Sequence, residues 1–164
     1  MRVTYREYDT SDWHAVVNLN LRAADQEELK AATGGSVFAA LCASLEASDE
    51  TWVIEMGDEI VGVFGVSDLG TVGIPWFVCT DKLFESNDGR AGFAYGSREI
   101  IRGWKVKYPF LTNCVAKDHT VARRWLRWLG FSFTAGERFL SDPSVPFIQF
   151  YMEGDREVQP CAIQ

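Results

Sequence analysis

The sequence lacks the features that mark membrane-spanning, secreted and zinc-binding proteins. No apolar run in its 164 residues approaches the ~20 residues that a helix needs to cross a bilayer. The N-terminal segment has no continuous apolar stretch of the kind found in signal peptides. The cysteines are widely spaced without a Cys-x-x-Cys pair, and His14 lies far from His119, so the usual zinc-ligand patterns are absent. We therefore expect a soluble protein with no bound metal that is not secreted by a signal peptide.

Positive charge is also in short supply. Asp and Glu outnumber Lys and Arg by 23 to 16, which gives a net charge of −7, so we expect no direct binding of nucleic acid. Residues 98–127 depart from this balance because basic side chains predominate there. This stretch suits a small phosphorylated ligand or an acidic partner, and it is equally compatible with two solvated helix faces.

The first third of the chain combines a strand with helical segments. Residues 3–8 alternate between apolar and polar side chains, which predicts a short strand. Residues 9–12 supply side chains that favour a helix N-cap. A second helical segment covers about residues 25–32 and ends at Gly34-Gly35, and Ser36 is suited to cap a third.

Three strand-like runs follow in the middle of the chain. The runs at 51–56 and 60–66 flank Gly57-Asp58-Glu59, which predicts a hairpin. The second run is apolar on both faces, which is typical of a central strand. A third strand covers about 72–79 and contains Pro75. Because proline cannot donate to a sheet ladder, this strand is expected to lie at an edge or to carry a bulge there.

The remaining chain alternates helices with strands. A loop, a helix, a strand, a helix and two strands are predicted in that order at residues 80–92, 93–107, 110–115, 121–129, 131–135 and 147–153. A helix between two strands implies a parallel crossover in a mixed sheet. We therefore predict one α/β domain over residues 1–153 and a tail at 154–164.

The segment from His119 to Phe131 resembles the late helix of the GNAT acetyltransferases, whose pattern is Asn-x-x-Ala-x-x-x-Tyr-x-x-x-Gly-Phe. Ala122, Gly130 and Phe131 match this pattern, whereas His119 replaces the asparagine and Leu126 replaces the tyrosine. The order of strands and helices is also similar. The resemblance implies a mixed, mostly antiparallel central sheet of about six to seven strands flanked by helices.

A narrower resemblance is to the internal virion proteins of T7-like phages, which are themselves GNAT-related. It is carried by Pro75-Trp76-Phe77, Tyr108-Pro109, Asn113-Cys114-Val115, Arg124-Trp125-Leu126 and the aromatic end at 147–152. This resemblance implies a phage protein located in the host cytoplasm or the virion interior.

In GNAT enzymes acetyl-CoA, a co-substrate, lies in a cleft where the fourth and fifth strands splay apart beside a bulge, and Pro75 is placed to produce such a bulge. The resemblance implies that the strand backbone after Pro75 pairs with the pantetheine arm. The glycine-bearing segment at 89–92 would present amides and a helix dipole to the pyrophosphate, although the long side chain usual at the start of this loop is absent. The predicted cofactor-binding residues are Trp76, Phe77, Val78, Cys79, Gly89, Arg90, Ala91, Gly92, Asn113 and Arg123.

The catalytic groups of the family are matched only in part. Leu126 cannot protonate the departing thiolate as the usual tyrosine does. Tyr95 or Cys79 could replace it, although both can also be interpreted as packed side chains. The strand at 72–79 carries no carboxylate to act as a base. His119 is able to titrate near neutrality in this neighbourhood or, alternatively, caps the late helix and faces solvent.

Two functional hypotheses follow. The first is a phage GNAT-type N-acyltransferase that transfers acetyl from acetyl-CoA to an amine, with a host protein as one potential acceptor. The second is a catalytically degenerate GNAT-fold protein that acts as a virion component or binds a host protein. A homodimer is compatible with both hypotheses, and neither requires a membrane.

Overall fold

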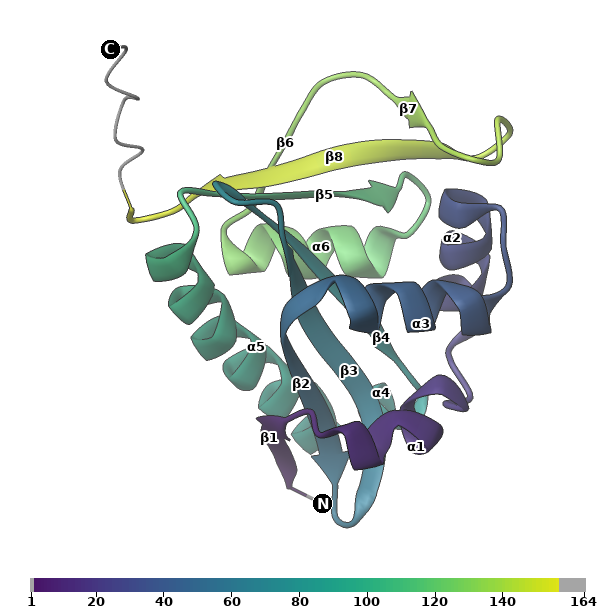
Figure 1. Ribbon diagram of the computed structural model, residues 1–164, viewed down its shortest axis with the longest axis vertical. Coiled ribbons are helices and arrows are strands. Elements are labelled where there is room, and N and C mark those ends of the chain that lie inside the picture. The colour runs from purple at the N-terminus through teal and green to yellow at the C-terminus, as the bar shows by residue number, and fades with distance from the viewer. Residues whose placement is uncertain (1, 157–164) are drawn as a thin grey trace.

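The protein is built on an eight-stranded sheet with helices on both faces (Figure 1). The computed structural model describes residues 2–156. The strands are β1 (Val3–Glu7), β2 (Ser48–Met56), β3 (Glu59–Asp68), β4 (Val72–Cys79), β5 (Phe110–Ala116), β6 (Ser132–Phe133), β7 (Arg138–Phe139) and β8 (Pro146–Glu153). The helices are α1 (Trp13–Val17), α2 (Ala23–Thr33), α3 (Val37–Ala47), α4 (Lys82–Glu85), α5 (Asn87–Lys107) and α6 (Thr120–Leu129), and a 3-10 turn spans Thr10–Asp12.

The sheet is mixed, as the element order predicts, and mostly antiparallel, as the GNAT resemblance implies. Its strands lie in the order β1-β2-β3-β4-β5-β8-β6, and β7 pairs with β8. The pairing of β4 with β5 is parallel, and the other pairings are antiparallel. The sheet has more strands than expected because the segment before β8 contributes two strands of only two residues each.

Local capping signals define the ends of several helices. Asp9 accepts from the Ser11 amide and forms a capping box with Asp12 ahead of α1. Gly34 adopts a left-handed conformation after α2, with φ 70°, and Ser36 accepts from the Ala39 amide to cap α3. These predictions from the sequence are confirmed.

Two apolar layers pack on opposite faces of the sheet. Phe93, Ile101 and Trp104 of α5 join Leu126 and Leu129 of α6 in one buried cluster. The other cluster contains Val16 of α1 and Leu41 of α3, together with Val53, Val63 and Val78 of the sheet. The sheet therefore separates an α5/α6 side from an α1–α3 side.

The loop predicted at residues 80–92 is wrong, because most of it is helical. α4 occupies Lys82–Glu85, and α5 begins at Asn87 after Ser86, which accepts from the Gly89 amide. A Cβ at Gly89 would lie 2.2 Å from the Leu83 carbonyl oxygen, and one at Gly92 would lie 2.6 Å from Val3 Cβ. Glycine is a weak helix former, but here it allows close packing that the sequence pattern alone does not reveal.

The first residues of the predicted tail are attached to the fold. The Gly154 amide donates to Pro109 O at 2.8 Å, and the Asp155 amide donates to Lys105 O at 2.8 Å. The rest of that tail, including Cys161, lies outside the described residues. Within residues 2–156, no helix combines the length and the apolar character needed to cross a membrane.

Close packing of α5 on β1 predicts opposite effects for two alanine substitutions in this helix. A Cβ at Gly96 would lie 1.9 Å from the Tyr5 ring, which is held by a 2.9 Å hydrogen bond from its hydroxyl to Phe93 O. We expect Gly96→Ala to lower the free energy of unfolding by about 1–3 kcal/mol. Gly103→Ala meets nothing within 4 Å and is expected to raise it by up to about 1 kcal/mol.

Urea denaturation of the two variants measures both effects. Equal stabilisation by both substitutions would show that α5 does not approach β1 closely.

Candidate functional site

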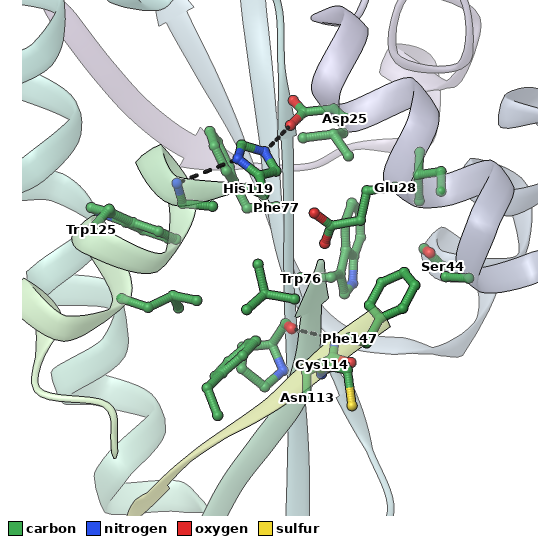
Figure 2. A pocket seen from close by; sticks show the side chains of 18 of the residues that line it. Asp25, Glu28, Ser44, Trp76, Phe77, Asn113, Cys114, His119, Trp125 and Phe147 are labelled. Carbon is green, nitrogen blue, oxygen red and sulfur yellow. Dashed lines mark hydrogen bonds and ion pairs between the residues drawn. The ribbon is translucent and has the colours of Figure 1, made fainter. Parts of the chain in front are cut away.

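The parallel strands β4 and β5 separate after a short pairing. They pair only at Val72 with Phe110 and at Gly73 with Leu111. Further along, the ladder is replaced by a side chain: Asn113 Nδ2 donates to Pro75 O at 2.8 Å, and Asn113 Oδ1 accepts from the Cys114 amide at 2.7 Å. Pro75 has no N–H to offer to β5, so Asn113 marks the point at which the sheet opens (Figure 2).

Pro75 lies in β4, at the point where β4 loses its pairing with β5. The register between β3 and β4 runs without a shift from Asp68 with Gly73 to Gly62 with Cys79, so β4 has no bulge against β3. Pro75 instead faces the side on which β4 has lost its neighbour. The prediction of an edge strand is wrong, because β4 lies between β3 and β5 in the sheet, and that of a bulge is wrong for the β3–β4 ladder.

The backbone N–H and C=O of Phe77 in β4 face the opening. The Cys79 amide donates to Asp25 Oδ2 at 3.1 Å and Cys79 O accepts from the Arg22 amide at 3.0 Å, so Cys79 directs its backbone away from β3. Backbone groups alternate in direction along a strand, and Phe77 therefore directs its N–H and C=O to the same side. Among residues 2–156, no strand pairs with Phe77 on that side.

A cavity of about 200 Å³ lies in this opening and reaches both sides of the sheet. Phe64, Phe77 and Trp125 line it on the α5/α6 side, where they belong to or pack against the same apolar cluster. Trp76 and Val78 line it on the α1–α3 side. The two strands therefore leave a passage through the sheet rather than closing along their length.

Aromatic side chains narrow the α5/α6 half of this passage. The rings of Phe77 and Phe93 stack with centroids 4.6 Å apart, and Trp125 lies 5.0 Å from Phe93. Trp125 Nε1 also donates to Ser97 Oγ at 3.3 Å. These contacts fix the walls on this side, while the cavity beside them remains open.

Asp25 of α2 links the end of β4 to the start of α6. It accepts from Arg22 Nε at 3.0 Å and Arg22 Nη2 at 2.7 Å, and from the Cys79 amide at the end of β4. Its Oδ1 lies 3.3 Å from His119 Nε2 at the start of α6. Burial alone would raise the pKa of Asp25, but hydrogen bonds from His119 and Arg22 outweigh it and hold that pKa below its usual value.

Glu28, one turn after Asp25, points into the cavity (Figure 2). Its Oε2 is buried and has no hydrogen-bond partner among the described residues. Burial raises the pKa of Glu28 to about 7, against the opposing effects of His119 and the Ala116 backbone. A carboxyl group with a pKa near neutrality in a cavity is suited to accept and release protons.

His119 lines the cavity and caps α6. Its Nδ1 accepts from the Ala122 amide at 3.4 Å, so Nε2 carries the proton that faces Asp25. Both ring nitrogens are therefore engaged within the protein. The capping interpretation is confirmed, but the expectation that the capping side chain faces solvent is wrong, because it is only 9% exposed. A catalytic role for His119 stays a prediction.

The other two predicted catalytic residues lie outside the cavity. Cys79 is fully buried, and burial raises the pKa of its thiol well above the usual value. Tyr95 is 72% exposed on α5. Neither side chain is among those lining the cavity, so their positions argue against a role in proton transfer.

Only four of the ten predicted cofactor residues line the cavity, and Cys79 is not one of them. Trp76, Phe77, Val78 and Asn113 line the cavity. The segment at 89–92 forms the first turns of α5 instead of a loop, and its glycines are packed against Leu83 and Val3.

Neither predicted arginine reaches the cavity. Arg90 Nη1 donates to Asn87 Oδ1 at 3.0 Å. Arg123 Nη1 donates to Lys117 O at 2.9 Å, and its guanidinium lies 5.7 Å from the centroid of the Phe133 ring. Arg90 and Arg123 do not line the cavity.

Comparison with solved structures defines the fold. A Streptococcus mutans protein is 18% identical, with a TM-score of 0.70 over 92% of this chain and 98% of that chain. Spermidine N-acetyltransferase from Vibrio cholerae, in complex with CoA and spermine, is 14% identical, with a TM-score of 0.64 over 93% and 96%. A GNAT family acetyltransferase from Elizabethkingia anophelis with acetyl-CoA bound is 12% identical, with a TM-score of 0.60 over 93% and 98%.

The fold is therefore that of the GNAT acetyltransferases, as the late-helix pattern implies. No protein-family model matches the sequence, and no curated protein matches it. The likeness lies in the fold rather than in the sequence.

The buried carboxyl group of Glu28 predicts a stability difference that depends on pH. Its pKa is about 7 in the folded protein against 4.5 for an ordinary glutamate. Because the raised pKa favours the neutral form in the fold, the contribution of Glu28 is fully present below about pH 4.5 and is lost as the pH rises through 7. We expect Glu28→Gln to be more stable than the wild type by up to about 3 kcal/mol at pH 8, and by much less at pH 5.

Urea denaturation at the two pH values measures this difference. Glu27→Gln is the matched control, since Glu27 is exposed on the same helix and its substitution is expected to change little. A loss of stability in Glu28→Gln at pH 8 would show that the carboxylate has a stabilising partner.

Proposed function

We propose that the protein is a GNAT-type N-acyltransferase that uses acetyl-CoA to acetylate an amine. The observation that carries this proposal is the passage between β4 and β5, lined from both sides of the sheet. A transfer between two substrates requires that each approach the reacting carbonyl from a different direction, and a passage through the sheet permits this. Two of the similar structures carry CoA or acetyl-CoA.

The backbone of Phe77 is suited to hold the pantetheine arm of acetyl-CoA. Its N–H and C=O face the opening, where no strand of the described part of the chain pairs with them, so an amide-containing chain is able to pair with them as an added strand. The Phe77 amide is also a donor able to stabilise negative charge on a thioester oxygen. These groups fit the pantetheine and thioester portion of acetyl-CoA.

The start of α5 is less suited to bind the nucleotide end of acetyl-CoA. Gly89 already donates its amide to Ser86 Oγ at 3.0 Å, and Asp88 adds negative charge to the first turn of α5. A helix N-terminus binds phosphate through free amides and the positive end of its dipole. Both properties are reduced here, so the proposal rests on the passage and not on the predicted phosphate loop.

A non-catalytic role is the second candidate. Leu126 lines the cavity at the position of the usual tyrosine and cannot donate a proton. The aromatic contacts of Phe77, Phe93 and Trp125 occupy part of the α5/α6 side. On this alternative, the protein keeps the fold to bind another protein, as the resemblance to internal virion proteins implies. A phage origin, a host-protein acceptor and the cellular location remain predictions from the sequence.

Titration with acetyl-CoA separates the two candidates. Ala122 lines the cavity from α6, whereas its neighbour Val121 is 57% exposed and does not line it. We expect Ala122→Phe to fill the passage and to weaken acetyl-CoA binding by at least about tenfold. Val121→Phe serves as the matched control and is expected to bind as the wild type does.

Calorimetry on the folded variants, checked by circular dichroism, gives these affinities. Absence of wild-type binding at millimolar acetyl-CoA would contradict the enzyme proposal and favour the non-catalytic one. Binding that Ala122→Phe leaves unchanged would place the donor elsewhere.

A further inference from the structure

The α1–α3 side of the cavity is suited to bind a molecule that carries a cationic group on an apolar body. Its walls on this side are formed largely by apolar side chains: Leu29, Leu41, Trp76, Leu140 and Phe147. Trp76 is fixed in place because its Nε1 donates to Ser48 Oγ at 2.7 Å. A substrate body that fits these walls is apolar or aromatic.

The charged side chains that line the cavity are not equivalent. Arg22 and Asp25 pair with each other, and His119 faces Asp25. Glu28 lies in the same cavity with a buried oxygen that no described residue contacts by a hydrogen bond. A buried carboxylate oxygen without a hydrogen-bond partner is costly, and a ligand ammonium group removes that cost. Glu28 is therefore the group that a cationic ligand would meet.

We propose, resting on the acyltransferase function proposed above, that the acceptor is a primary monoamine on an apolar stem, whose ammonium group Glu28 binds and deprotonates. A second ammonium group would find no second free carboxylate, because Asp25 is already paired. An acceptor carboxylate would likewise find Arg22 engaged. The cavity of about 200 Å³ is smaller than the ~300–1,000 Å³ of sites that enclose drug-sized ligands, so the acceptor is small or inserts only a stem.

The proton balance assigns Glu28 a defined step. The amine arrives as R–NH3+, and Glu28 accepts one proton, which frees the nitrogen lone pair. That pair attacks the thioester carbonyl, a C–N bond forms, and the C–S bond breaks with its electron pair leaving on sulfur. The nitrogen loses a second proton and the thiolate gains one. The products are an amide, the free thiol of CoA and one proton released to solvent.

Two kinds of acceptor carry a primary amine on an apolar stem: a free amine and a lysine side chain of another protein. Phenethylamine and butylamine represent the first kind, and Nα-acetyl-lysine methylamide represents the second. Spermidine tests whether additional charge is accepted. The neutral analogue 2-phenylethanol tests whether the charge is needed.

Calorimetric titration of the wild type, Glu28→Gln and the control Glu27→Gln with these probes tests the proposal. Phenethylamine is expected to bind the wild type and Glu27→Gln, and to bind Glu28→Gln at least about tenfold more weakly. Binding of 2-phenylethanol should not distinguish the three proteins. Equal binding of phenethylamine to Glu28→Gln, or preferred binding of spermidine, would overturn the proposal. Preference for the lysine probe over both free amines would identify a protein acceptor.

A pH profile of kcat/KM separates proton transfer from a merely structural role. The groups that face Glu28 are Arg22 and Asp25 on its own helix, His119 at the start of α6 and Cys114 on β5. We expect the wild type to lose activity below about pH 7, and Glu28→Gln to be at least about 100-fold slower without that acid limb. A Glu28→Gln profile that keeps the same limb would exclude Glu28 as the base.

Binding of acetyl-CoA is measured separately from binding of the amines. The acyltransferase proposal and the acceptor proposal can therefore fail independently. Glu28→Gln is expected to bind acetyl-CoA as the wild type does. If the wild type binds acetyl-CoA but no amine in a manner that depends on Glu28, the acyltransferase function stands and the acceptor inference fails. If amines bind through Glu28 but acetyl-CoA does not bind, the acyltransferase proposal fails, and with it the acceptor role.

Discussion

The opening of the sheet depends on a single missing N–H. Pro75 stands where β4 would next donate to β5, and the Asn113 side chain takes the carbonyl that the ladder leaves free. Because β3 pairs with β4 along its length, the loss of pairing falls wholly on the β5 side. The exposed backbone of Phe77, the cavity and the access from both sides all follow from this local interruption of the ladder.

Helix α2 places two carboxyl groups one turn apart in contrasting environments. Asp25 receives hydrogen bonds from Arg22, His119 and the Cys79 amide, and its pKa falls below the usual value. Glu28 has no comparable partners, and burial raises its pKa to about 7. Pairs of groups whose surroundings drive their pKa values apart are typical of sites that divide structural and proton-transfer roles. Here Asp25 holds the framework and Glu28 is left available.

The sequence predicts those parts of the fold that local chemistry determines. The caps at Asp9 and Ser36, the left-handed glycines at Gly34 and Gly130, and the hairpin at residues 57–59 depend only on neighbouring residues. The helix at Asn87 could not be predicted in this way, because its glycines are explained by packing against other segments.

Only part of the candidate site could be predicted from the sequence, for a similar reason. Trp76, Phe77, Val78 and Asn113 follow from the position of Pro75 in its strand and from the GNAT resemblance. Glu28 was missed because an acidic residue on a helix ordinarily faces solvent. The available signal was its place with Arg22, Asp25, Leu29 and Ala32 on one helical face, since these residues all line the cavity. That face mixes charged and apolar residues, so a search for apolar periodicity passes over it.

The position of Asp25 on α2 has a mechanical consequence. Asp25 fastens the helix both to the end of β4 and to the start of α6, and Glu28 extends from the next turn of the same rigid element. A shift of α2 that lets the two strands move further apart must carry Glu28 with it. The position of α2 therefore determines both the distance between β4 and α6 and the location of the Glu28 carboxyl group. Neither can change without the other.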